Sequence, residues 1–255
     1  MMIKLLEKIG KLVITALEVV GRTVAIVSSA FAVVHTVKGP ALFRQMAHLG
    51  ADSLPIVLLT MLFTGMVMTV QIAHEFIKYG AQSSVGGVIA IAMGRELAPV
   101  LTGVVVAGRV GAAITAEIGS MKVTEQIDAL RVMAVSPVAF LVVPRLMACL
   151  VMLPVLIIFG DVIGTIGGYF MATQYAGISE FAFLHSIWVF CEPNDVIGGL
   201  IKGIFFGIII ALVGCHKGLT TENGAEGVGK ATTGSVVTSI ILIFISNYFL
   251  SLLLY

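Results

Sequence analysis

Five long apolar runs dominate the pattern of the chain. Ser53 to Ala73 and Ala231 to Tyr255 carry no charged residue. The other three runs carry only one or two charges each and cover Val85 to Gly108, Leu146 to Thr173 and Val196 to His216. Because a transmembrane helix needs about 20 predominantly apolar residues, we predict five membrane-spanning helices. The expected fold class is an all-α integral membrane protein.

The first 50 residues show a different pattern, typical of the membrane surface. From Lys4 to Val20, polar and apolar residues occupy opposite helical faces, which predicts a helix lying in the membrane interface, with a soluble cap helix as the alternative. Thr23 to Val37 is uncharged but shorter than the ~20 residues that a span requires. We interpret this stretch as interfacial or re-entrant, and the alternative is a tilted sixth span. A single domain, 1–255, then divides into an interfacial segment, 1–50, and a five-helix core, 51–255.

The distribution of basic residues predicts the orientation. Lys and Arg recur between spans two and three and between spans four and five, whereas residues 174–195 contain neither. By the positive-inside rule, the N-terminus is cytoplasmic and the C-terminus external. The external connection includes an aromatic-rich stretch, 181–190, that is too short to cross. We predict that it forms a short external interfacial helix whose outer face holds Phe181, Leu184, His185 and Trp188.

Glycines recur every four residues in two of the predicted spans. They are Gly160, Gly164 and Gly168 in the third span and Gly199, Gly203 and Gly207 in the fourth. Such spacing lets helix backbones approach closely within lipid, so we assign these residues to helix packing.

The composition and the motifs argue against catalysis. Of the residues, 58% are hydrophobic and 11% are charged, and the net charge of +1 gives no reason to expect nucleic acid as a partner. The sequence contains no HExxH, no GxSxG and no Cys/His cluster with metal-ligand spacing. Residues 224–231 imitate a phosphate-binding loop, but Ala231 replaces the hydroxyl residue that would bind magnesium. We therefore predict no catalytic residue, no metal and no cofactor in this chain.

Four charged residues lie inside predicted spans, where charge is costly and usually paired or functional. Arg95 and Glu96 are adjacent, so they point about 100° apart on a helix and cannot neutralise each other side by side. Glu96 either lines a transport path or belongs to a structural polar network. Asp161 and Lys202 are each alone in their spans, and we expect them to pair with neighbouring helices; Lys202 could also extend its amine toward the outer surface.

A charged run, MKVTEQIDALRVM (121–133), follows the second span. Its spacing predicts a short amphipathic cytoplasmic helix, capped by Ser120 or Thr124. Such a helix could dock into a soluble partner or be an ordinary connection, and spacing alone does not decide.

A region of more than forty residues, from GRELAPVLTGVVVAGRVG to ITAEIGSMKVTEQIDALRVMAVSP, resembles the MlaE/YrbE-type permeases of MCE-associated lipid ABC transporters. SLPIVLLTMLFTGMV in span one and ATTGSVV in span five extend the similarity. The resemblance implies a permease subunit that moves phospholipids between membranes and helps to maintain outer-membrane lipid asymmetry. It implies a location in the bacterial inner membrane. The implied partners are a second copy, a cytoplasmic ATPase that binds ATP and magnesium, a periplasmic MCE-domain ring and a small accessory subunit.

The resemblance also implies two sets of site residues. A lipid cavity between two copies would be lined by Met68, Ile72, Phe76, Tyr79, Arg95, Glu96 and Leu97. A coupling helix that inserts into the ATPase would use Thr124, Glu125, Gln126, Asp128 and Arg131. Two alternatives stay open: an ion-coupled secondary transporter with Glu96, Asp161 and Lys202 as a relay, and a non-transporting scaffold for an MCE protein.

Overall fold

The computed structural model of the chain describes residues 39–255, which form helices joined by short connections, without a strand. The predicted all-α membrane fold is confirmed. The helices, in chain order, are α2 (Gly39–Gly50), η2 (Ala51–Ser53), α3 (Leu54–Lys78), η3 (Gln82–Ser84), α4 (Val85–Ala92), the π-helical η4 (Met93–Leu97), α5 (Ala98–Val106), the π-helical η5 (Ala107–Gly111), α6 (Ala112–Val123), α7 (Gln126–Val132), the π-helical η6 (Val138–Val142), α8 (Val143–Gln174), α9 (Glu180–Phe190), α10 (Pro193–Leu219) and α11 (Gly224–Leu254).

Five helical stretches within the described part are long and apolar enough to cross a membrane, as the sequence predicts. Four of them extend beyond their predicted runs at both ends, whereas the fifth begins earlier than predicted and ends one residue sooner. They cover Leu42–Lys78, Gln82–Val123, Val138–Gln174, Pro193–Leu219 and Gly224–Leu254. The extension of span one begins in α2, which packs on α8. The predictions for residues 1–38, including whether 23–37 cross the membrane, lie outside the described residues.

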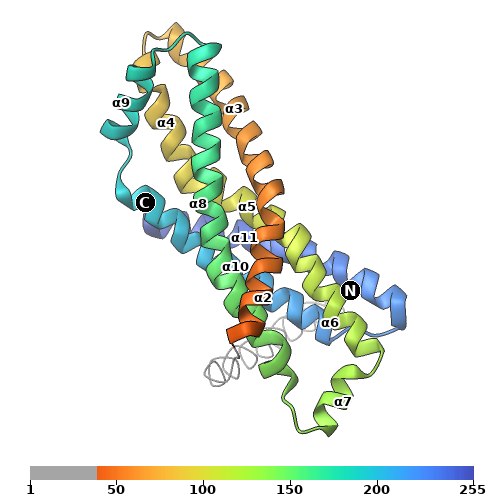
Figure 1. Cartoon of the computed structure of the whole chain (residues 1–255). Helices are drawn as coiled ribbons and strands as arrows, with labels where there is room; N and C mark the ends of the chain where they lie inside the picture. The colour runs from red at the N-terminus through yellow and green to blue at the C-terminus, as the bar shows by residue number, and fades with distance from the viewer. Residues whose placement is uncertain (1–38) are drawn as a thin grey trace, which may run out of the picture.

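Helix α8 runs through the length of the molecule and organises the packing (Figure 1). It packs most extensively against α3 and α10, while α10 also packs against α6 and α11. The short helices α7 and α9 lie at opposite ends of the molecule (Figure 1), which agrees with the prediction that they lie on opposite sides of a membrane.

Glycines allow the central helices to approach closely, as predicted. A Cβ added at Gly65 of α3 would lie 1.9 Å from the carbonyl oxygen of Gly164 in α8. One added at Gly207 of α10 would lie 2.7 Å from the carbonyl oxygen of Cys149 in α8. Because these neighbours are backbone atoms, any larger residue would separate the helices.

The short external helix forms where the aromatic run predicts it. Ser179 caps α9, and its hydroxyl accepts a hydrogen bond from the amide of Ala182. Helix α9 packs on α4, with Ser186 buried against Gly86 and Gly87. Its other face exposes Phe181, Leu184 and Trp188, so the predicted outward apolar face is present.

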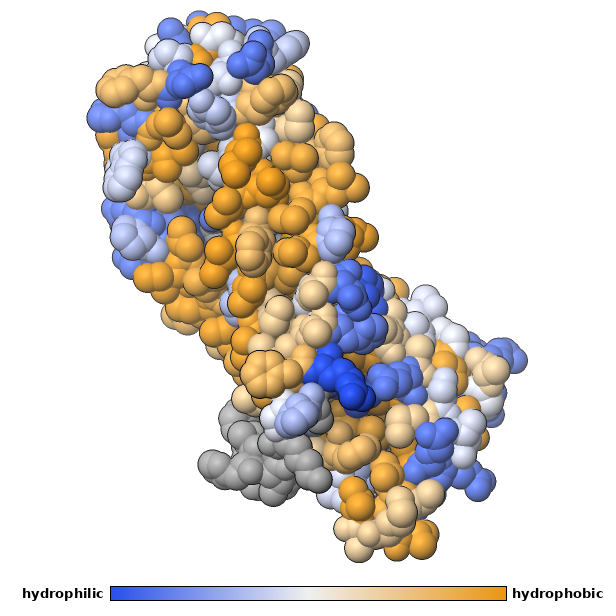
Figure 2. All heavy atoms as spheres, viewed as in Figure 1, coloured by the Kyte–Doolittle hydropathy of each residue, from blue (hydrophilic) through white to orange (hydrophobic). Residues whose placement is uncertain are grey.

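The sides of the molecule carry an extensive apolar surface. Figure 2 shows this surface along the flank, interrupted by a hydrophilic patch where α9 gives way to α10. Exposed side chains such as Phe63, Phe159 and Ile166 contribute to the apolar flank. Helix α11 is the least buried of the five spans, so lipid or another protein must cover most of its apolar surface.

Candidate functional site

The candidate site lies beside Pro99, at the junction of η4 and α5. Pro99 has no backbone N–H, so it cannot donate a hydrogen bond to the carbonyl of Arg95, four residues earlier in the same helical stretch. The π-helical segment η4 lies at this position, as such segments often do near functional sites. The Nζ of Lys202 donates to the freed Arg95 carbonyl at 2.7 Å. This hydrogen bond therefore joins a lysine of α10 to the backbone of span two at Arg95.

Glu96 accepts hydrogen bonds from α10 and α11. Lys202 Nζ donates to its Oε1 at 2.7 Å, and Asn247 Nδ2 donates to its Oε2 at 2.8 Å. Ser251 Oγ lies 2.7 Å from Oε1 and 2.8 Å from Lys202 Nζ. Lys202 is fully buried, whereas the Glu96 side chain remains 42% exposed. The lysine is thus a fixed internal partner, and the carboxylate keeps an accessible side.

Arg95 pairs with Asp195, an acidic residue at the start of α10, the helix that also carries Lys202. Its Nε donates to Asp195 Oδ1 at 2.7 Å, and its guanidinium lies 4.6 Å from the centre of the Tyr255 ring. Asp195 also accepts from the Glu192 amide, completing a capping box at the start of α10. As expected, Arg95 and Glu96 do not pair with each other. Each uses its own partner on α10.

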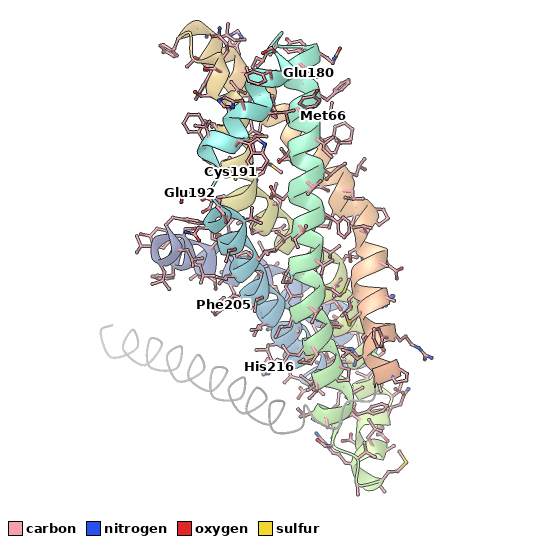
Figure 3. All side chains as sticks on the ribbon, turned by 60° about the vertical axis from the view of Figure 1, so that its left-hand side comes forward. Met66, Glu180, Cys191, Glu192, Phe205 and His216 are labelled. Carbon is pink, nitrogen blue, oxygen red and sulfur yellow. The ribbon has the colours of Figure 1, made fainter. Side chains whose placement is uncertain are left out.

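The end of α11 closes the cluster. The Tyr255 hydroxyl lies 3.1 Å from the carbonyl oxygen of Asp195, and the Lys202 Nζ lies 5.2 Å from the Tyr255 ring centre. Figures 1 and 3 both place the end of α11 beside the start of α10, which Glu192 marks in Figure 3. The cluster therefore unites three helices from distant parts of the sequence.

Asp161 lies near this cluster but is not joined to it by a hydrogen bond. Its Oδ2 lies 3.7 Å from the position of a Cβ added at Gly94, while its Oδ1 is buried and has no hydrogen-bond partner among residues 39–255. The expected pairing with a neighbouring helix holds for Lys202 and not for Asp161. The idea that Lys202 extends toward the outer surface is wrong, because its amine is enclosed by three hydrogen-bonding partners.

The structure places the apolar cavity residues on two elements. Met68, Ile72 and Phe76 share one side of α3 and are partly buried against the core, whereas Tyr79 is exposed just after α3 ends. Leu97 ends η4, directly after Arg95 and Glu96. Within residues 39–255, no hydrogen bond connects the α3 residues to the charged cluster. Their role as a cavity wall stays a prediction.

The residues predicted to couple to an ATPase lie at the tip formed by α7, and their role stays a prediction. Asp128 accepts from Lys122 Nζ at 3.1 Å and from Arg131 Nη1 at 2.9 Å, while Gln126 Nε2 donates to the Thr124 hydroxyl at 3.1 Å. The predicted helix is present, but the predicted cap is wrong. Glu125 occupies the N-cap position in a left-handed conformation (φ 60°), and the Thr124 hydroxyl instead donates back to the Ser120 carbonyl.

Sequence reasoning missed four members of the cluster: Asp195, Asn247, Ser251 and Tyr255. One signal was available for three of them. Asn247, Ser251 and Tyr255 recur every four residues in an otherwise apolar run and therefore share one helical face.

These features define the class of protein as a multi-pass membrane protein with a charged cluster within its spans and no motif for a soluble enzyme. Residues 42–253 match the family described as Permease MlaE. A probable ABC transporter permease protein of Synechocystis sp. is 50% identical over 83% of this chain and 81% of its own length. A probable ABC transporter permease protein of Rickettsia prowazekii is 41% identical over 98% of both chains.

A plant relative shows a similar level of identity. The chloroplast protein TRIGALACTOSYLDIACYLGLYCEROL 1 of Arabidopsis thaliana is 41% identical over 82% of this chain and 59% of its own length. The chain belongs to the MlaE permease family and is an ABC transporter permease, a non-catalytic membrane subunit.

Proposed function

We propose that this permease moves phospholipids between membranes and is driven by a separate ATPase subunit. The observation that carries the proposal is the charged cluster at η4, where Glu96 and Arg95 keep 42% and 36% of their side chains exposed within an otherwise apolar span. Ionisable groups at such positions usually mark a transport path. A lipid requires both features, a polar place for its headgroup and an apolar surface for its chains.

The charges fit a phospholipid headgroup. Arg95 offers N–H donors to a phosphate, and Glu96 offers a carboxylate to a cationic group. Met68, Ile72, Phe76, Tyr79 and Leu97 would supply apolar contact for acyl chains. The Arabidopsis relative is named after trigalactosyldiacylglycerol, a diacylglycerol lipid, which supports a lipid as the cargo.

The exposed tip at α7 would receive the ATPase. Val132 and Met133 are 89% and 65% exposed there, at the end of the molecule opposite α9 (Figure 1). Apolar side chains exposed beside charged ones are typical of a protein contact. Thr124, Glu125, Gln126, Asp128 and Arg131 would form the polar part of that contact. ATP and magnesium would bind to the partner and not to this chain.

The sparse covering of the spans supports a second copy of the chain as a further partner. The exposed surface of α11 and the half-exposed cluster would face a second copy, which would close the lipid cavity. A periplasmic MCE-domain ring would sit at the α9 end, together with a small accessory subunit. The complex would lie in the bacterial inner membrane, with the N-terminus cytoplasmic and the C-terminus periplasmic, and would help to maintain outer-membrane lipid asymmetry.

Two rival functions make different predictions. An ion-coupled secondary transporter would use Glu96, Asp161 and Lys202 as a relay and would work without an ATPase. Membership of an ABC transporter family and the absence of a hydrogen bond between Asp161 and the cluster argue against this relay. A non-transporting scaffold would tolerate the loss of Glu96.

Reconstitution separates these possibilities. The complete complex is placed in vesicles containing phosphatidylethanolamine, phosphatidylglycerol and a fluorescent phosphatidylethanolamine, and lipid transfer to an acceptor is followed with and without ATP. We expect transfer that requires ATP and is reduced at least tenfold by Glu96→Gln. Transfer driven by an ion gradient without ATP would favour the secondary transporter. Unchanged transfer by the Glu96 variant would favour the scaffold.

Substitution of Asp128 tests the coupling assignment. Asp128→Asn removes two exposed ion pairs, each worth about 0–1 kcal/mol, so the fold should remain intact. We expect about fivefold less ATPase to co-purify with the variant, at an unchanged melting temperature. Glu180→Gln, at the opposite end of the molecule, is the matched control and should leave ATPase recovery unchanged. Full ATPase recovery with Asp128→Asn would show that α7 does not require this carboxylate for docking.

A further inference from the structure

Another ion pair lies outside the site described above, beside the base of the hairpin that α6, α7 and α8 form. Arg145, in the first turn of α8, is 4% exposed at its side chain, and its Nη2 lies 2.8 Å from Oε2 of Glu117 on α6. Its Nη1 donates to the carbonyl of Leu141 at 2.7 Å. Helices α6 and α8 flank α7 in the chain, so this pair joins the two arms of the hairpin (Figure 1).

The burial of Arg145 makes this pair unusual. Its Nε is buried without a hydrogen-bond partner in the described part of the chain, and Glu117 provides the carboxylate that balances its charge. Glu117 itself is 55% exposed. A buried guanidinium with an unsatisfied donor is costly, so a contribution to stability does not by itself account for this pair.

The pair completes a series of polar contacts that leads from α7 through α6 to α8. Asp128 ties α7 to Lys122 at the end of α6. Helix α6 is joined to α10, where the Thr115 hydroxyl lies 3.2 Å from the Gly214 carbonyl oxygen. Without Arg145, a displacement of α7 would reach α6 and α10 through these contacts but would lack a direct polar link to α8.

Helix α8 packs closely against α3 of span one, so a movement of α8 would displace α3 as well. The backbone of α8 touches α3 where Gly164 meets Gly65, so the two helices cannot separate or slide without losing this contact. Span one holds Met68, Ile72 and Phe76, the proposed apolar wall. A rigid link between α6 and α8 would therefore move the wall together with the charged cluster on η4.

We propose that the Glu117–Arg145 ion pair is a positioning link that transmits the movement of α7 to α8 and α3, and thereby couples ATP hydrolysis to lipid movement. This role rests on the proposed function, because it requires an ATPase at α7. The pair lies outside the predicted lipid cavity and outside the predicted ATPase contact. Its loss should therefore change the amount of lipid moved per ATP and leave ATP hydrolysis itself largely unchanged.

The test uses the complete complex in the vesicles described above, with ATP hydrolysis and fluorescent lipid transfer measured on the same sample. Glu117→Gln leaves the buried arginine in place without its counter-charge, and Glu117→Asp retains the charge. Glu75→Gln is the matched control, because Glu75 also pairs with a basic residue but lies at the outer end of α3. Arg145→Lys is a second, independent variant, since an amine cannot hold both partners in the geometry of a guanidinium.

We expect Glu117→Gln and Arg145→Lys to lower the lipid moved per ATP at least fivefold, with ATP hydrolysis within twofold of the parent. Glu117→Asp should recover more than half of the ratio, and Glu75→Gln should leave it unchanged. An unchanged ratio in both variants would overturn the proposal. So would an equal fall in hydrolysis and transfer, which would indicate a docking or folding role. If the parent complex transferred no lipid with ATP, the proposed function would fail instead.

Discussion

Replacing Lys202 with methionine is expected to abolish lipid transfer and to lower stability markedly. The lysine is fully buried and its amine bonds Glu96, the Arg95 carbonyl and Ser251. Breaking a buried ion pair costs about 3–5 kcal/mol, and we expect about 2–4 kcal/mol here, because the exposed side of Glu96 can be hydrated. The melting temperature of the purified protein in detergent measures this loss.

A double variant separates the structural role of the pair from its role in transport. Lys202→Met combined with Glu96→Gln leaves no unpaired charge, so the melting temperature should recover most of the loss. Transfer should remain absent, because the proposed headgroup site has lost the Glu96 carboxylate that would meet a cationic headgroup. Lys78→Met is the matched control, since its pair with Glu75 is exposed and worth little. Normal transfer by the double variant would reduce the Glu96–Lys202 pair to a structural element.

The spans could be predicted from the sequence because their signal is local. Apolar runs of sufficient length require helices in lipid, and the aromatic run at 181–190 was long enough for an interfacial helix and too short for a span. The glycine spacing also identified packing faces correctly, because a missing side chain has the same meaning wherever the partner helix comes from. Only the helix ends and the cap of α7 differed from the prediction.

The charged cluster could be predicted only in part, because its pairing is not local. The sequence identified Arg95, Glu96 and Lys202 as expensive charges, but the contact between Glu96 and Lys202 joins residues more than a hundred positions apart. The π-helical segment was also invisible, since Pro99 alone is compatible with an ordinary helix start. The prediction that Lys202 could extend to the surface failed because it considered one helix without its neighbours.

Asp195 was missed for a related reason. Its sequence context, Glu-Pro-Asn-Asp before an apolar run, indicates a helix start, and the residue does cap α10. The same carboxylate also holds Arg95 through its Oδ1. A residue that satisfies one local rule gives no sequence signal of a second partner, so only the packing of η4 against α10 reveals this contact.

Replacing Gly199 with alanine is expected to disrupt the cluster by displacing a backbone. A Cβ at this position would lie 2.2 Å from the Gly94 carbonyl oxygen and 3.1 Å from Pro99 Cγ, so α10 must move away from η4. That movement would draw Lys202 from the Arg95 carbonyl and Asp195 from the Arg95 side chain. Overpacking of this kind costs about 1–3 kcal/mol, and transfer should fall more than tenfold because both charges of the site lose their partners.

Gly108→Ala is the matched control. A Cβ there meets nothing within 4 Å, so helix propensity predicts a small gain, up to about 1 kcal/mol. The melting temperature should therefore fall for Gly199→Ala and rise slightly for Gly108→Ala. The transfer rate should fall only for Gly199→Ala. Equal behaviour would mean that the close approach of α10 to η4 does not hold the cluster in place.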